Sequence, residues 1–197
     1  MLRQLLVAQG RVGTLYGVLV NPSRQKNREQ FSRLKQEANN LGLTLVRRRA
    51  SNLRGIKRAY DFFRGANVAG VVVTADAFFN NNRQKIVEEA AFDPTTNLSG
   101  VPTIYQWREF TDNFVDGGVP KNGGLISFGP SMSEAYEKAG EYIGKIAAGT
   151  SPSNLPCSTP EEDLIQVWVN DRTAVAHQMN LANIPAMLDG KPVNRRP

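Results

Sequence analysis

A carboxylate followed by two aromatic side chains stands in the middle of the sequence. Asp76 comes directly after the most hydrophobic run of the chain, and Phe78 and Phe79 follow it. Such a group suits a solute that carries an ammonium group next to an apolar body, because opposite charges pair and a ring face attracts a cation. The alternative is structural: Asp76 caps the next helix and both phenylalanines fill the core. The spacing of these three residues leaves both interpretations open.

A second group of polar and aromatic residues follows another short apolar run. Tyr105 ends that run, and Arg108 and Glu109 come soon after it. Arg108 could hold a carboxylate through two parallel hydrogen bonds, and Glu109 could hold an amine. The same pair could instead be a surface ion pair, which adds little stability. Two more candidates are Asn21, for which a turn-forming role competes, and Phe128, which precedes the N-terminus of a helix, where anions bind.

Residue sets for catalysis or for metal binding are not recognisable. Cys157 and His177 are the single cysteine and the single histidine, so no intramolecular disulfide can form and a structural zinc site is not expected. We expect His177 to be a partly exposed helix residue. The sequence holds no G-x-S-x-G elbow, no Walker A motif and no G-x-G-x-x-G fingerprint after a strand. We therefore expect a protein that is not an enzyme and that holds no metal and no cofactor.

Composition and charge narrow the class of protein. A chain of 197 residues with 41% hydrophobic and 21% charged residues is typical of a globular domain. The net charge of +6 comes without a basic face interleaved with aromatic residues, so nucleic acid is not an expected partner. The longest near-continuous apolar run, 68–73, is too short to span a membrane. The first nine residues lack the apolar core of a secretory signal peptide, which predicts a cytoplasmic location for the chain as written.

Alternating strand and helix patterns indicate how the candidate residues are positioned. The expected fold class is α/β, a parallel sheet with helices on both faces. The carboxyl ends of parallel strands share one edge of a sheet, and open α/β sheets bind ligands there. Asp76, Phe78, Tyr105, Arg108 and Glu109 should therefore cluster along one edge. The strands expected near residues 14–20, 43–47, 68–74 and 102–105 should be parallel and central in the sheet.

The second half of the sequence departs from this alternation. A helix is expected over 131–146, opened by a capping box and carrying a long apolar stripe. Pro and Ser residues indicate a linker over 151–156, and a last strand over 164–169 precedes a final helix. The tail, 191–197, is expected to be disordered.

Several blocks that end apolar runs occur in a fixed order along the chain. They are Asn21-Pro22 within 17–22, Asp76 and Phe78-Phe79 within 75–79, 101–105, Arg108-Glu109-Phe110, Phe128-Gly129-Pro130 within 123–130, Leu155-Pro156, 164–170 and Ile184-Pro185. Together they resemble the ABC-transporter substrate-binding protein family with the type 1 periplasmic-binding fold, over about residues 13–189. The chain resembles only the second lobe of such a protein, and the first lobe is missing. Phe128 stands where family members have tyrosine, and the chain ends differently from the acidic family ending.

The resemblance implies a function in transport. Family members capture a small solute, often an amino acid or a related compound, between two lobes and deliver it to a membrane permease. This implies a periplasmic location and a permease partner. The implied organisation is an α/β lobe over 1–122, a segment crossing to the missing first lobe over 123–150, a returning strand and final helix over 151–190, and the tail. The implied ligand-binding residues are Asn21, Asp76, Phe78, Phe79, Tyr105, Arg108, Glu109 and Phe128.

Two other functions remain open. One is a truncated lobe without a competent cleft, which acts as a structural or dimerising unit. The other is a sensor domain like those of sugar-responsive repressors, against which the missing DNA-binding helix pair counts. An apolar stripe left in water would cost much of a domain's stability. We therefore expect the stripe of 131–147 to be covered, either by folding back onto its own sheet or, as we favour, by a second copy in a homodimer.

Overall fold

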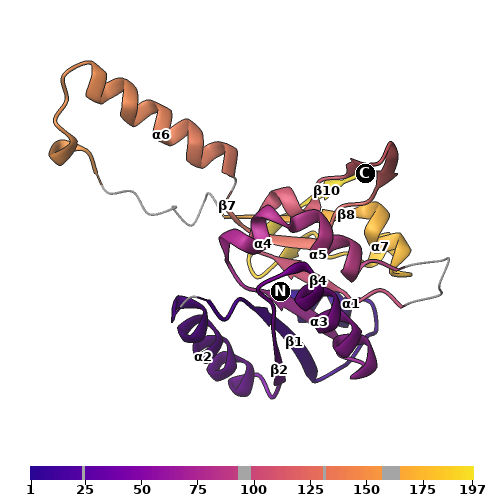
Figure 1. Cartoon of the computed structure of the whole chain (residues 1–197). Helices are drawn as coiled ribbons and strands as arrows, with labels where there is room; N and C mark the ends of the chain where they lie inside the picture. The colour runs from indigo at the N-terminus through magenta and orange to yellow at the C-terminus, as the bar shows by residue number, and fades with distance from the viewer. Residues whose placement is uncertain (24, 93–98, 131, 157–164) are drawn as a thin grey trace.

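A single large sheet forms the centre of the molecule (Figure 1). The structure, a computed structural model, describes residues 1–23, 25–92, 99–130, 132–156 and 165–197. Eight strands pair in the order β2-β1-β3-β4-β7-β8-β10-β9, and β5 and β6 form a separate hairpin. In chain order the elements are α1 Leu2–Ala8, β1 Leu15–Val20, α2 Gln25–Asn40, β2 Thr44–Arg49, α3 Leu53–Gly65, β3 Gly70–Val73, α4 Ala77–Asn81, α5 Arg83–Ala90, β4 Thr103–Tyr105, η1 Arg108–Thr111, β5 Phe114–Asp116, β6 Val119–Lys121, β7 Ile126–Pro130, α6 Met132–Ala147, η2 Pro152–Asn154, β8 Ile165–Asn170, α7 Asp171–Ala176, η4 Leu181–Asn183, β9 Met187–Leu188 and β10 Lys191–Arg196.

The first half of the sheet confirms the expected α/β class. Strands β2, β1, β3, β4 and β7 all run parallel, with Tyr16 of β1 paired to Gly70 of β3 and Ile104 of β4 paired to Ile126 of β7. Strand β2 is an edge strand and not a central one, which corrects that part of the prediction. From β1 the chain continues outward to β2 and then returns to the other side of β1 as β3. The strand order therefore reverses between β1 and β3, and such a switch point is where open α/β sheets bind ligands.

Helices cover both faces of the sheet. On one face α3, α4 and α5 bury Phe63 and Phe79, which are fully excluded from solvent. On the other face α1 and α7 contribute Leu5 and Ala174 to a second core. Helix α3 approaches β1 so closely that a Cβ on Gly17 would lie 2.6 Å from the Phe63 ring. The glycine is thus required for this helix to pack against the sheet.

Strand β7 keeps the chain within the sheet beyond the point where we expected it to leave. Its register pairs Tyr105 with Ser127 on one side and, in antiparallel direction, Ile165 of β8 with Pro130 on the other. Ile126 is fully buried, so the strand is held by the core as well as by its ladder. The expectation of a crossing segment from residue 123 is therefore corrected: the chain leaves the sheet only after Pro130.

Helix α6 begins after β7 and stands away from the sheet (Figure 1). The helix itself was expected from its sequence pattern, and the structure confirms it. Three of its large hydrophobic side chains are exposed, Tyr136 by 71%, Ile143 by 68% and Ile146 by 42%. The alternative in which this stripe folds back onto its own sheet is thus wrong. Among the described residues, no helix combines the length and apolar composition needed to cross a membrane.

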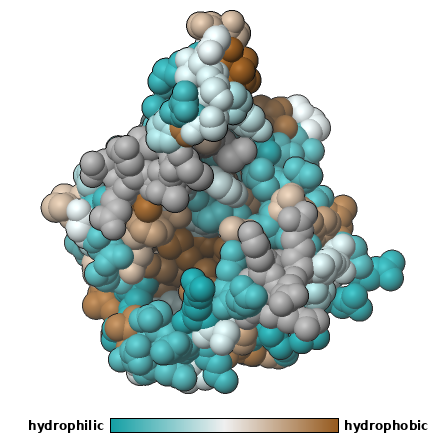
Figure 2. All heavy atoms as spheres, turned by 90° about the vertical axis from the view of Figure 1, so that its left-hand side faces the viewer, coloured by the Kyte–Doolittle hydropathy of each residue, from teal (hydrophilic) through white to brown (hydrophobic). Residues whose placement is uncertain are grey.

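The side on which β7 ends and α6 begins is hollowed. Figure 2 shows this side, and hydrophobic residues gather in the hollow at its centre. Because β1, β3 and β4 run parallel to β7, their carboxyl ends lie at the same edge of the sheet. The edge expected to bind a ligand is therefore concave and partly apolar.

The C-terminal tail is ordered, which overturns the prediction of disorder. Strand β10 runs parallel to β8, and Val193 packs against the second core. Two ion pairs hold its end, Arg195 with Asp171 and Arg196 with Asp112 at 2.6 Å. This segment contains few hydrophobic residues, so the formation of β10 depends on contacts with residues that are distant in the sequence.

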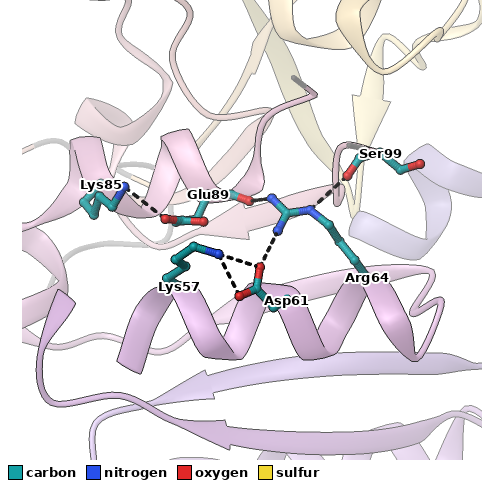
Figure 3. Close-up of polar contacts among 6 residues, drawn as sticks. All are labelled: Lys57, Asp61, Arg64, Lys85, Glu89 and Ser99. Carbon is teal, nitrogen blue, oxygen red and sulfur yellow. Dashed lines mark hydrogen bonds and ion pairs between the residues drawn. The ribbon is translucent and has the colours of Figure 1, made fainter. Parts of the chain in front are cut away.

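A polar cluster joins α3 to α5 and to the segment before β4 (Figure 3). Arg64, near the end of α3, donates to the carbonyl oxygen of Glu89 and, over 3.1 Å, to that of Ser99. The carboxylate of Glu89 pairs with Lys85 at 3.0 Å, and this hydrogen bond raises the pKa of Lys85. Asp61 contacts Arg64 from the same helix. The cluster fixes the helices that flank β3 and β4, and so the loops at the ends of these strands.

Candidate functional site

The two loops at the switch point meet through a buried polar contact. Asn21 follows β1 and Asp76 follows β3 closely, and Asn21 Nδ2 donates to Asp76 Oδ1 over 2.9 Å. Both residues are buried, with 6% and 8% of their surface exposed. Asn21 Oδ1 accepts from the backbone N–H of Ser23, which fixes the orientation of the amide. The structure thus brings together two residues that are 55 positions apart in the sequence.

Asp76 also has the structural role that the sequence left open. Its Oδ1 accepts from the backbone N–H of Phe78 over 2.9 Å and caps the short helix α4. Such caps satisfy one of the backbone donors that every helix leaves unpaired at its start. The carboxylate is therefore held in one orientation by donors from two loops.

The two phenylalanines after Asp76 have different environments. Phe79 is fully buried among the residues of the first core, which favours the structural alternative for this ring. Phe78 is half-buried, and its ring centroid lies 5.7 Å from that of Phe79. The reason is that consecutive residues of a helix point in different directions, so one ring enters the core and the other stays at its margin.

Tyr105 is a core residue. Its ring stacks on Phe110 at 4.7 Å, and only 1% of the residue is exposed. Burial raises the pKa of the Tyr105 hydroxyl well above its ordinary value. Tyr105 is the last residue of β4, and strand alternation turns its side chain inward, under η1. The residue also lines the cavity that His177 lines, and its contact with a ligand stays a prediction.

Gln106 and Trp107 occupy the place at the end of β4 that Tyr105 was expected to take. The hydrogen-bond network orients the Gln106 amide so that its nitrogen donates to the carbonyl oxygen of Val73, 3.0 Å away. Its oxygen accepts from Trp107 Nε1 over 3.1 Å. This links the ends of β3 and β4. Both residues directly follow the apolar run, which is the signal that could have identified them.

The remaining candidates lie further along the same edge. Arg108 and Glu109 begin η1 and are half-buried, and the Arg108 guanidinium lies 5.6 Å from the centre of the Trp168 ring. Phe128 is half-buried in β7 and packs with the second core, whereas Phe78 packs with the first. The sheet therefore separates these two rings. The eight candidates share an edge but do not form one cluster.

His177 lies just after α7 and is buried, which corrects the expectation of partial exposure. It lines a cavity of about 530 Å³ together with Gly124 and Thr173. Burial lowers the pKa of His177 from 6.5 to about 4, with a smaller contribution from the Arg11 charge. The imidazole is therefore neutral in the folded protein at neutral pH. No pattern in the sequence around it indicated this burial.

Comparison with known proteins identifies the fold. No protein-family model matches the chain, and neither does any curated protein. A conserved domain protein from Vibrio cholerae superposes with a TM-score of 0.71 at 15% identity, covering 98% of this chain and 57% of the other. The ABC domain from Streptococcus pneumoniae in complex with L-Trp gives 0.67 at 16% identity, with coverages of 96% and 59%. A substrate-binding protein with adhesive properties from Clostridium difficile, in its ligand-free, open structure, gives 0.59 at 20% identity, with coverages of 99% and 59%.

The three similar structures match this chain over nearly the same share of its length. Each covers nearly all of this chain but less than three fifths of the other protein. At identities of 15–20% these likenesses show the fold of the chain. The parallel strands and the flanking helices agree with that fold. The chain therefore has the α/β fold of substrate-binding proteins and spans a part of their length that is consistent with one lobe.

Proposed function

We propose that this chain is a solute-binding lobe, which holds a small molecule at the carboxyl edge of its parallel strands. The observation that carries the proposal is the buried Asn21–Asp76 pair at the switch point between β1 and β3. Polar side chains from both loops converge there, at the place where open α/β sheets bind ligands. The fold of substrate-binding proteins supports the same function.

The solute we propose is an amino acid or a related compound. The Asp76 carboxylate is held in one orientation by Asn21 and by the backbone of α4, which lowers the side-chain entropy lost on binding an ammonium group. Phe78, half-buried beside it, provides an apolar contact and a ring face for the cation. Binding of this kind involves no covalent step, and the chain would act as a binding protein and not as an enzyme. Delivery to the permease of an ABC importer, from the periplasm, completes the proposal.

A thermal-shift screen of amino acids tests this function, with Asp76→Asn as the informative variant. Asparagine can accept the same hydrogen bond from the Phe78 N–H, so the helix cap and the melting temperature should be kept. Loss of the carboxylate charge should weaken an ammonium-bearing ligand about tenfold or more, the size of one charge-assisted hydrogen bond. Asp116→Asn, on the exposed β5–β6 hairpin, is the matched control. Equal binding by the parent and Asp76→Asn, or no stabilisation by any amino acid, would refute the proposal.

A second candidate, a dimerising unit, is favoured by the exposed face of α6. We propose that Tyr136 and Ile143 are covered by a second copy of the chain, in a homodimer through residues 131–147. Sedimentation at micromolar concentration should then give a dimer, and Ile143→Glu should give a monomer, because a charge cannot be buried unpaired in such an interface. Thr150→Glu, after the end of α6, is the control for added charge. A parent protein that sediments as a monomer contradicts the homodimer.

A further inference from the structure

A second hollow lies on the opposite half of the sheet from the switch point. Its volume is about 530 Å³, and β8 and β10 form its floor. Arg108 reaches it from η1, and Gln166, Trp168, Lys191 and Asn194 line it. Among the described residues that line this hollow, two are cationic and none is a carboxylate. The lining residues themselves therefore carry positive charge, while the carboxylate of Glu134 contacts the lining through Gln166.

Arg108 differs from the other arginines nearby in its contacts. Within the described ranges, its guanidinium has no ion pair and no hydrogen bond, and its Nε atom is buried without a partner. Arg195 and Arg196, in contrast, form ion pairs with Asp171 and Asp112, although the Nε atom of Arg196 is also buried without a partner. A guanidinium stays charged at all physiological pH values and presents donors in a planar fork. Leaving it half-buried and unpaired costs free energy that an anion would recover.

The ring of Trp168 lies beside this guanidinium. The cation lies 5.6 Å from the ring centroid, and Arg196 lies 4.7 Å from it. The indole is itself fixed, because Trp168 Nε1 donates to Gln166 Oε1 over 2.8 Å. Gln166 Nε2 in turn donates to Glu134 over 2.9 Å. Arg108 is therefore pre-positioned, and binding an anion would cost little side-chain entropy.

We infer that this hollow binds an oxyanion, the carboxylate or phosphate group of a small solute, with Arg108 as its bidentate anchor. Lys191 adds a second positive charge at the rim. The hollow is separate from the Asn21–Asp76 pair, since β3 and β8 are three strand spacings apart, roughly 14 Å. A compact amino acid cannot fill both. The inference thus stands independently of the proposed solute site.

Fluorescence of Trp168 provides the test. In a Trp107→Phe background Trp168 is the single tryptophan of the chain. Benzoate, inorganic phosphate and the neutral isostere benzamide are titrated against it. Saturable binding of benzoate, with benzamide about tenfold weaker or worse, is the expected result, because one charge-assisted bidentate contact contributes at least that factor. Binding of benzoate alone would identify a carboxylate as the ligand group, and binding of phosphate alone a phosphate.

Two variants assign the effect to the guanidinium. Arg108→Gln should weaken anion binding about tenfold, and Arg108→Lys should fall between it and the parent, because lysine keeps the charge but not the fork. Arg172→Gln, an exposed arginine on α7, is the matched control and should bind as the parent does. If Arg108→Gln does not fold, a salt titration of the parent protein serves as the test in its place. Added salt should lower the affinity for benzoate but not the affinity for benzamide. No saturable binding of either anion, equal affinity for benzoate and benzamide where benzoate binds, or an Arg108→Gln variant with parental affinity would overturn the inference.

Discussion

Replacing Gly129 by alanine is expected to destabilise this protein by about 3 kcal/mol or more, the upper end of what overpacking a well-packed site typically costs. An ideal Cβ at this position would lie 1.8 Å from the carbonyl oxygen of Gln106, far inside contact distance. The obstacle is backbone, at the carboxyl end of β4, and the ladder between Tyr105 and Ser127 holds both strands together. Neither strand can withdraw without losing hydrogen bonds at the candidate site. A loss of this size is a large fraction of the total stability of many domains.

Urea unfolding followed by circular dichroism measures this effect. Gly140→Ala, in α6, is the matched control, because nothing lies within 4 Å of an ideal Cβ there. It should leave the stability unchanged or raise it by up to about 1 kcal/mol, the helix preference of alanine over glycine. An unfolding free energy of Gly129→Ala within about 0.5 kcal/mol of the parent, the range of ordinary surface changes, would contradict the close packing of β7 on β4.

Acidification is expected to remove up to about 3 kcal/mol of stability through His177 alone, since one pKa unit corresponds to 1.36 kcal/mol. The folded pKa is about 4, lowered from 6.5 chiefly by burial. Between these values the unfolded chain binds a proton that the folded chain does not. The contribution of His177 is therefore fully present above about pH 6.5 and is lost as the pH falls toward 4.

The single histidine makes this measurement direct. Its imidazole proton resonances should titrate near pH 4 in the folded protein, and no other residue contributes imidazole signals. The drop in unfolding free energy between pH 7 and pH 4.5 should be smaller in His177→Gln, because glutamine does not titrate. An imidazole that titrates near 6.5 in the folded state would show that the ring is solvated, and the predicted pH dependence would then vanish.

The sequence by itself determined the parallel half of the sheet and its helices. Apolar runs such as Val71–Val73 alternate with amphipathic segments, and this local periodicity depends only on near neighbours. Because a strand's carboxyl end is visible where the run stops, the positions of Asn21 and Asp76 at one edge were also predictable. Helix α6 likewise follows from its apolar stripe. The capping residue expected at position 131 lies outside the described residues. The features that were predicted correctly are those that depend on residues close together in the sequence.

The tertiary structure decided the features that depend on distant partners. Strand β10 forms because Val193 meets β8 and two arginines meet acids from other elements, not because the segment favours a strand. Tyr105 and Phe79 turned inward because strand and helix geometry point adjacent side chains in different directions. The burial of the His177 imidazole and the lack of an ion pair at the Arg108 guanidinium likewise depend on elements that are distant in the sequence. Burial and pairing are set by which elements pack together, and no local pattern in the sequence records that.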